Sequence, residues 1–208
     1  TAEGANDLMW FPCDGESYTK QENEVVAQMK HACSWISVNV KAEGAAIGWT
    51  LNSLVIDDIA HTGKAVCGET MANWDTLSDY EPEDYYNPQS NTFDPQVGED
   101  LSADLEEYYK VAANNFIVIP QTPTTLNVTY SYLSDDKEGT ENDIWFTEIK
   151  PVELDYDGND TPWQSGVHYI YNLTITATEI LIDPVVVEWT ESVYDADKDK
   201  EGNQPIEI

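Results

Sequence analysis

Arginine is absent from this sequence of 208 residues, and positive charge of any kind is scarce. Nine lysines face 40 acidic residues, which leaves a formal net charge of -31 at pH 7. A chain of this length with ordinary composition would carry roughly ten arginines. Nucleic acids and anionic lipid surfaces repel a protein this acidic, so both classes of partner are excluded. The composition favours a very soluble secreted or surface protein.

Long apolar runs are also missing. No stretch of about twenty apolar residues occurs, so the sequence predicts neither a transmembrane helix nor membrane insertion of the mature form. The chain opens TAEGANDLMWF without an initiator Met or a signal-like segment, and we interpret Thr1 as a processing site or an expression boundary. Cys13, Cys33 and Cys67 have no metal-type spacing. Their odd number allows one disulfide with a free thiol, or no disulfide.

Catalytic signatures are absent as well. The sequence holds no GxSxG, HExxH or paired CxxC motif and no phosphate-binding glycine loop. Carboxylates occur throughout, so no pair stands out as a catalytic acid and base. We interpret His31, His61 and His168 as surface or packing residues. We therefore expect no enzymatic activity, no cofactor and no metal, and a carboxylate hydrolase is the least favoured function.

Two acidic runs have the oxygen-rich character of calcium loops. Residues 195–201 alternate like the start of an EF-hand loop, but Lys200 occupies the position of the required glycine and Ile206 that of the closing glutamate. Residues 155–160 (DYDGND) form a second polar turn. We interpret both as solvated loops, and weak calcium binding stays an open alternative.

What the sequence does contain is a series of extended segments, rich in Val, Ile, Thr, Tyr and Trp and mostly alternating with a period of two. Strands are predicted at 35–41, 49–59, 116–120, 125–133, 144–149, 168–180 and 184–189. The last two are separated by a pause at Asp183-Pro184. One helix is predicted over residues 23–32, where apolar residues recur at helical spacing. Many short strands joined by turns indicate antiparallel β-sandwiches.

The alternation fails between residues 75 and 110, which are acidic, tyrosine-rich and interrupted by proline. Because this stretch is too long for an ordinary connection, we interpret it as a surface excursion or part of an interface. A strand restarts at FIVIPQ just beyond it. We therefore predict an N-terminal β domain over 1–112, with the excursion 75–110, and a C-terminal β domain over 113–208, which ends in the tail 190–208.

The stretch WQSGVHYIYNLTITATEILIDPVVVEWTE resembles the closing segment of fimbrillin-type subunits of Bacteroidales fimbriae. That segment has Trp and Gly before a Tyr-x-Tyr-x-Leu strand, and then a strand that ends in Trp. The matching residues are Trp163, Gly166, Tyr169, Tyr171, Leu173 and Trp189. FIVIPQ, with Pro120 and Gln121, is similar to the opening of the family's C-terminal domain, and residues 29–41 and 53–66 resemble parts of its N-terminal domain.

The resemblance implies two transthyretin-like antiparallel β-sandwich domains with at most one or two short helices. It also implies export through the outer membrane as a lipoprotein precursor, cleavage after an Arg that removes the first strand, and polymerisation by strand exchange. The lack of arginine fits a product that survives such a protease. The implied function is a structural fimbrial subunit of the stalk, which joins other copies and related pilins and supports adhesion to host or bacterial surface ligands.

The C-terminal tail is expected to supply the donated strand. An acidic arm after Trp189 leads to the expected donor residues, which are Gln204, Pro205, Ile206, Glu207 and Ile208. Burial of either isoleucine in the next subunit would contribute about 1.5–3 kcal/mol. A frayed acidic terminus is the alternative interpretation of this tail.

A tripeptide in the acidic stretch offers a modification site. Asp75-Thr76-Leu77 looks like the Asp-Ser/Thr-aliphatic acceptor of surface proteins in Bacteroidetes, so Thr76 is a candidate for O-glycosylation. The alternative function for the whole chain is a monomeric surface adhesin or glycan-binding module, with the tyrosine-rich excursion as its contact surface. The sequence leaves open the adhesion receptor and the choice between stalk, anchor and tip subunit.

Overall fold

The computed structural model describes residues 7–11, 29–43, 47–86, 99–100, 109–110, 116–133, 145–176 and 178–189. Within these ranges the chain forms strands joined by turns, and no helix is long and apolar enough to cross a membrane. The strands are β1 (Met9–Trp10), β2 (Lys30–His31), β3 (Ser34–Ala42), β4 (Ile47–Cys67), β5 (Ala72–Tyr86), β6 (Glu99–Asp100), β7 (Tyr109–Lys110), β8 (Phe116–Val118), β9 (Thr125–Leu133), β10 (Trp145–Glu153), β11 (Val167–Ile175) and β12 (Ile180–Glu188).

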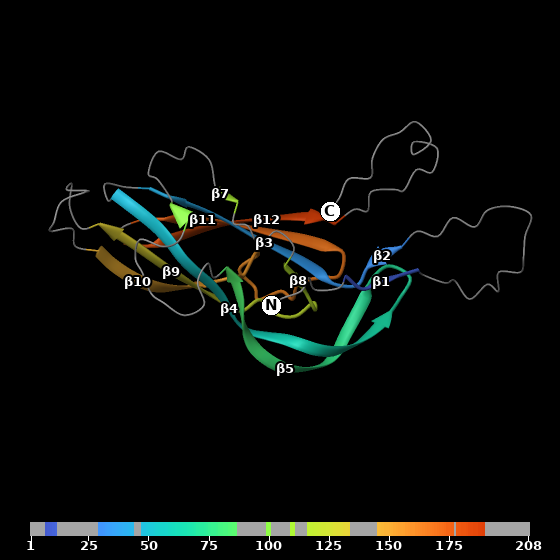
Figure 1. Cartoon of the computed structure of the whole chain (residues 1–208). Helices are drawn as coiled ribbons and strands as arrows, with labels where there is room; N and C mark the ends of the chain where they lie inside the picture. The colour runs from blue at the N-terminus through green and yellow to red at the C-terminus, as the bar shows by residue number, and fades with distance from the viewer. Residues whose placement is uncertain are drawn as a thin grey trace, which may run out of the picture.

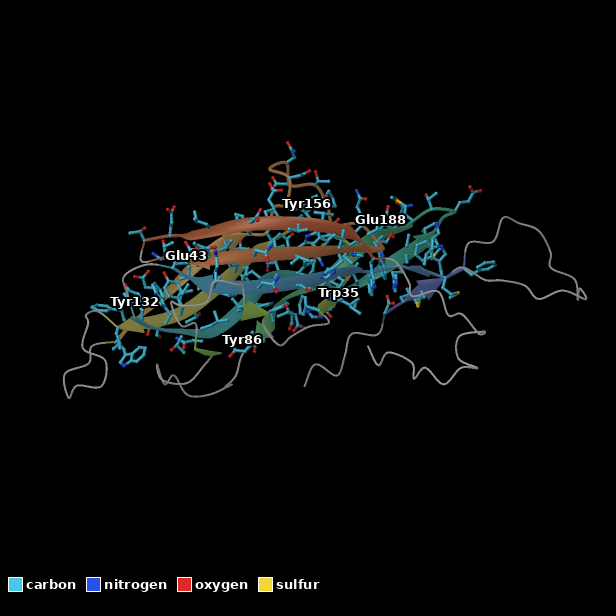
Figure 2. The ribbon with its side chains drawn as sticks, turned by 90° about the horizontal axis from the view of Figure 1, so that it is seen from above. Trp35, Glu43, Tyr86, Tyr132, Tyr156 and Glu188 are labelled. Carbon is cyan, nitrogen blue, oxygen red and sulfur yellow. The ribbon has the colours of Figure 1, made fainter. Side chains whose placement is uncertain are left out.

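Two five-stranded sheets pack face to face, as Figure 1 shows. One has the order β10-β9-β4-β5 with β6 also paired to β4, and the other has the order β12-β11-β3-β7 with β8 also paired to β3. β1 and β2 form a small separate ribbon. In the view from above, Glu43 and Tyr132 lie toward one end of the sandwich and Glu188 toward the other (Figure 2). The prediction of an all-β sandwich is confirmed.

The hydrophobic core lies between the two sheets. Because successive residues of a strand point to opposite faces, alternate positions of β3, β9 and β11 are buried, as at Val38, Val128 and Leu173. Aromatic side chains make up much of the core, and each removes roughly 150–250 Å² from water. The largest fully buried aromatic residues are Trp49, Tyr130, Trp163, Tyr169 and Tyr171.

The central pairing of one sheet joins strands that are far apart in the sequence. β3 runs parallel to β11, with Trp35 opposite His168 and Ala42 opposite Ile175. In the other sheet β9 pairs with β4. Strands from both sides of residue 113 therefore share each sheet and one core. Within the described residues, the predicted boundary near residue 113 does not separate two sandwiches, because alternation predicts a strand but not its partner.

β5 is the main addition to the predicted strands. Most of β5 falls in the stretch 75–110, where the sequence lacks a regular alternation. The strand pairs antiparallel with β4. β4 itself continues to Cys67, well beyond its predicted end at residue 59. Most side chains in the outer half of this β4–β5 ribbon are exposed, so its many acidic residues stay in water. β5 therefore forms without alternating apolar residues.

Two predictions of local structure are wrong. Residues 23–28 of the predicted helix lie outside the described residues, but the helix does not continue to residue 32, because Lys30–His31 pairs with β1 as strand β2. The predicted pause at Pro184 is also not a turn. The chain reverses between Ile175 and Ile180, which lie opposite each other, and Pro184 lies inside β12. The Glu179 N–H donates to Thr176 Oγ1 (3.1 Å) at this reversal. An edge strand tolerates proline because one side of its ladder is unpaired.

Candidate functional site: an open edge strand and its aromatic anchor

A buried hydrogen-bonded chain links the loop before β11 to the strand itself. Trp163 Nε1 donates to Tyr171 Oη over 2.8 Å, and the Tyr171 hydroxyl donates to the Leu154 carbonyl oxygen over 2.7 Å. Tyr169, which shares the inner face of β11, accepts from the Gln164 N–H over 2.9 Å. All three aromatic side chains therefore bury their rings while pairing their polar atoms, as a stable core requires.

Gly166 joins this aromatic anchor to the end of β12. Its φ of +72° lies in the left-handed region, which glycine adopts without strain. Its N–H donates to the Cys33 carbonyl oxygen (2.9 Å), and its own carbonyl accepts from the Trp189 N–H (2.8 Å). Trp189 in turn stacks on His31 with ring centroids 3.7 Å apart. The last described residue of the chain is thus held against the N-terminal part of the fold.

Histidine packing completes this end of the sandwich. His31 Nδ1 lies 2.6 Å from Asp7 Oδ2, and His168 stacks on Trp35 with centroids 3.7 Å apart. The third histidine, His61, lies 3.4 Å from Glu83 on the β4–β5 ribbon. In the described ranges no three His, Cys, Asp or Glu side chains are grouped so as to hold a metal ion.

Pro120 and Gln121 lie in the connection from β8 to β9. Gln121 is buried, and its Oε1 accepts from the Ala60 N–H over 2.9 Å. Its Nε2 donates to the Ile119 carbonyl (3.0 Å), and its backbone oxygen accepts from the Trp163 N–H (2.9 Å). One side chain therefore ties this connection to β4, and its backbone ties it to the aromatic anchor.

Burial also shifts the acidity of the core tyrosines. Desolvation raises the pKa of Tyr85 to about 12, although its hydrogen bond from the Val38 N–H acts in the opposite direction. Desolvation likewise raises the pKa of Tyr169 and of Tyr171 above the usual range. In all three the neutral phenol is favoured because the folded protein disfavours a buried charge.

Stability should therefore fall in alkaline solution. The folded-state pKa of Tyr85 lies above the ordinary tyrosine value of about 10, so its contribution is complete below pH 10 and is lost as the pH rises toward about 12. We expect urea unfolding to give a constant free energy up to about pH 9 and a steep decrease above pH 10. Tyr85→Phe should flatten this decrease. A free energy that stays level through pH 12 would contradict the assignment.

The strand at the edge of the second sheet exposes an apolar surface. β12 pairs with β11 on one side, and no described strand pairs with its other side. Val186 lies opposite Tyr169 and so shares its inward face, yet its side chain is 46% exposed. Val185 and Val187, on the outer face, are also exposed. An unpaired apolar edge of this kind is a template for another strand.

The neighbouring edge of the first sheet is protected in a different way. β10 lies beside β12 without pairing to it. On the inner face of β10, Glu148 accepts from the hydroxyls of Tyr130 (3.3 Å) and Tyr132 (3.1 Å), and Lys150 Nζ lies 2.9 Å from its carboxylate. The hydrogen bond from Lys150 is the main reason that the pKa of Glu148 is lowered. Inward charges disfavour the docking of an apolar strand, so β12 is the more open of the two edges.

The remaining predicted residues are placed as follows. Thr76 is exposed on β5, and its Oγ1 donates to Asp75 Oδ1 over 3.0 Å. The predicted donor, 204–208, lies outside the described residues. The polar turn 155–160 closes on itself, since Asp155 accepts from the backbone N–H groups of Asp157 and Gly158. The Glu148–Lys150 pair is not among the predicted site residues, although alternation along 145–153 places both residues on the same face as buried Val152.

These features define a β-sandwich domain with an open edge strand and a buried Tyr-x-Tyr-x-Leu strand beside it. The model of the fimbrillin-like family matches residues 1–189, and the chain belongs to that family. The resemblance read from the sequence is therefore confirmed. No curated protein sequence matches the chain.

Two solved structures share the fold. The crystal structure of a fimbrial protein from Bacteroides vulgatus is 17% identical, with a TM-score of 0.52, over 79% of this chain and 56% of that one. That of a putative cell adhesion protein from Parabacteroides distasonis is 11% identical, with a TM-score of 0.53, over 80% of this chain and 55% of that one. The present chain thus spans just over half the length of these proteins.

Proposed function

We propose that this chain is part of a structural subunit of a fimbrium at the bacterial cell surface. Membership of the fimbrillin-like family supports this function, and the open apolar edge of β12 is the structural observation that carries it. The subunit belongs to the stalk, polymerises with its own copies and related pilins, and supports adhesion. It reaches the surface through the outer membrane as a lipoprotein precursor.

Polymerisation proceeds by strand exchange after an N-terminal strand is removed from the precursor. The donor is Gln204–Ile208, and the acceptor is the outer edge of β12 in the next subunit. Val186, on the inner face of β12, gives the incoming isoleucines an apolar contact, because Ile206 and Ile208 share one face of a strand. The side of β12 that no described strand pairs with gives the donor backbone its hydrogen-bonding partners. Strand addition of this type draws affinity from the backbone and register from alternate side chains.

The test compares the full precursor with a version that lacks residues 204–208. Both are treated with an Arg-specific protease, which cannot cut within this chain because the chain contains no arginine. Unheated denaturing gels and negative-stain microscopy then report assembly. We expect a ladder and filaments from the intact protein only. Equal ladders would place the donor elsewhere, and monomers from both would favour a monomeric surface adhesin.

We also propose that Thr76 carries an O-linked glycan. The residue has a φ of +53°, which is unusual for a β-branched side chain, and lies where the pairing of β4 and β5 shifts register. The shift presents an exposed hydroxyl group beside Asp75. The intact mass of the protein from its native source, compared with that of Thr76→Val, tests this modification.

A further inference from the structure

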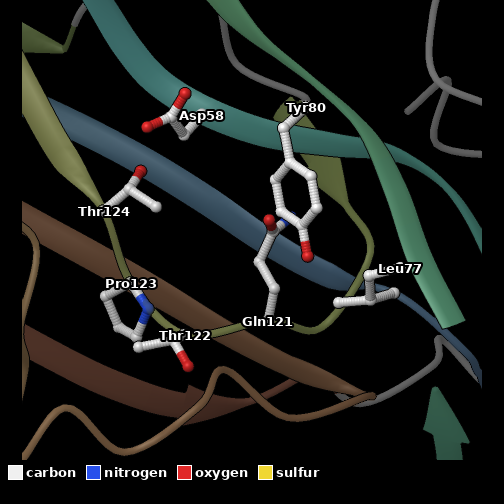
Figure 3. Close-up of a pocket in the computed structure, with 7 residues that line it drawn as sticks. All are labelled: Asp58, Leu77, Tyr80, Gln121, Thr122, Pro123 and Thr124. Atoms are coloured by element: carbon white, nitrogen blue, oxygen red, sulfur yellow. The ribbon is translucent and has the colours of Figure 1, made fainter. Parts of the chain in front are cut away.

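A hollow of about 560 Å³ opens on the side of the molecule where the β4–β5 ribbon faces the connection into β9. Figure 3 shows Leu77 and Tyr80 extending from β5, and Thr122 and Pro123 on the facing segment. Asp58 of β4 and Thr124 complete the wall, with buried Gln121 beneath them. The volume lies within the roughly 300–1,000 Å³ typical of sites for small ligands.

The shape of the hollow is fixed by the backbone around it. The ladder of β4 and β5 shifts register between Ile56 and Ile59, and Asp58 within this shift has a φ of +50°. Asp79, next to Tyr80, has a φ of +63°. Non-glycine residues in the left-handed region cost free energy and persist where the surrounding structure requires them, which occurs often at ligand sites.

The facing segment is tied to the same bend of β4. Thr124 Oγ1 donates to the Asp57 carbonyl oxygen over 2.6 Å, and the Gln121 side chain accepts from Ala60 N–H over 2.9 Å. These bonds lie on either side of Asp58 and tie the facing segment to β4. A ligand would therefore bind to a preformed site and would not have to order it.

Three polar groups line the wall of the hollow. Within the described part of the chain, the Asp58 carboxylate and the hydroxyls of Tyr80 and Thr122 make no hydrogen bond. The Tyr80 side chain is 50% exposed, and Leu77 and Pro123 add apolar surface beside it. The hollow therefore offers a strong acceptor, two hydroxyl groups and an aromatic ring within one concave surface.

We propose that this hollow binds a neutral sugar residue. A pyranose has one apolar C–H face, which fits against an aromatic ring, and a rim of hydroxyls, which can donate to a carboxylate and exchange hydrogen bonds with threonine and tyrosine. The lining contains no base, and the net charge of the chain is -31, so acidic sugars and phosphates are repelled. A single ammonium group would leave most of the volume unfilled.

The experiment is a titration of the unpolymerised chain, so its result does not depend on strand exchange. The probes are the methyl glycosides of glucose, galactose, mannose, fucose and N-acetylglucosamine, with methyl N-acetylneuraminate and Nα-acetyl-lysinamide as charged comparisons. Amide chemical shifts of Asp58, Tyr80, Thr122 and Thr124 report binding. We expect at least one neutral glycoside to shift these resonances saturably and the sialoside to leave them unchanged.

Two variants locate the site. Asp58→Asn removes the charge but keeps a residue type that tolerates the left-handed backbone, and Tyr80→Ala removes the ring from an exposed position. Each should raise the dissociation constant about tenfold or more, because a charge-assisted hydrogen bond or a stacking contact is lost. Asp183→Asn, a matched charge change on exposed β12, should have no effect.

Three results would overturn the proposal. The first is that no neutral glycoside shifts the four resonances. The second is that both variants bind as the wild type does. The third is that only Nα-acetyl-lysinamide shifts the resonances, which would identify the hollow as a pocket for a basic side chain of a protein partner.

Discussion

Trp163→Ala is expected to lower the free energy of unfolding by about 3–5 kcal/mol, the cost of truncating a large buried aromatic side chain. Trp163 is 1% exposed and packs with Tyr169 at a centroid distance of 6.4 Å. The alanine variant would leave a cavity between the sheets. It would also leave the Tyr171 hydroxyl without its donor, at the point where the loop before β11 meets the core.

Urea unfolding followed by circular dichroism measures this loss, with three comparison variants. Trp163→Phe keeps most of the ring and should lose less, which gives a measurable value if the alanine variant does not fold. Tyr171→Phe leaves Trp163 Nε1 and the Leu154 carbonyl without a partner and should cost about 1–3 kcal/mol. Ile149→Ala, at a site 65% exposed, should cost less than about 0.5 kcal/mol. A Trp163→Ala variant as stable as Ile149→Ala would show that the anchor does not hold the fold.

If β12 is the acceptor edge, Val186→Lys is expected to reduce the equilibrium constant for assembly about tenfold or more. The monomer should remain folded. The side chain is 46% exposed, so lysine can reach water from this position. An incoming apolar strand would instead have to bury that charge or displace it. The loss of one buried valine contact, about 1.5–3 kcal/mol, corresponds to roughly tenfold or more in an equilibrium constant.

The matched control is Val66→Lys, since Val66 is 54% exposed near the end of β4, a strand of the other sheet. Filament yield from the protease-treated precursor is measured by sedimentation and by unheated denaturing gels. We expect Val66→Lys to assemble like the wild type. If Val186→Lys assembles equally well, the acceptor lies on another edge, whereas a loss in both variants would indicate a general effect of added positive charge.

Local patterns were sufficient for some of the strands. Residues 125–133 and 116–118 form strands within their predicted ranges because alternation of β-branched and aromatic residues specifies a half-buried strand directly. Alternation does not predict the strand at 72–86, because few of its residues are apolar at every second position. β5 forms because β4 supplies a partner for its backbone, and such a partner is not encoded within the strand itself.

In the candidate site, the residues of the motif could be predicted from the sequence, but their contacts could not. Residues 163–189 contain a contiguous motif, so its aromatic residues can be predicted from the sequence alone. Their roles depend on atoms that lie far away in the sequence, such as Cys33, which accepts from Gly166, and His31, which stacks on Trp189. The hollow beside Asp58 could not be predicted at all, because its two walls belong to segments that meet only in the folded chain.

By itself, the sequence determined the all-β class and the family, because period-two alternation and a contiguous motif are local properties. Only the tertiary structure decided which strands are neighbours. The parallel pairing of β3 with β11 and the single core across residue 113 arise from contacts between distant segments. Among the described strands, β12 is an open edge for the same reason, because no other described strand pairs with its outer side.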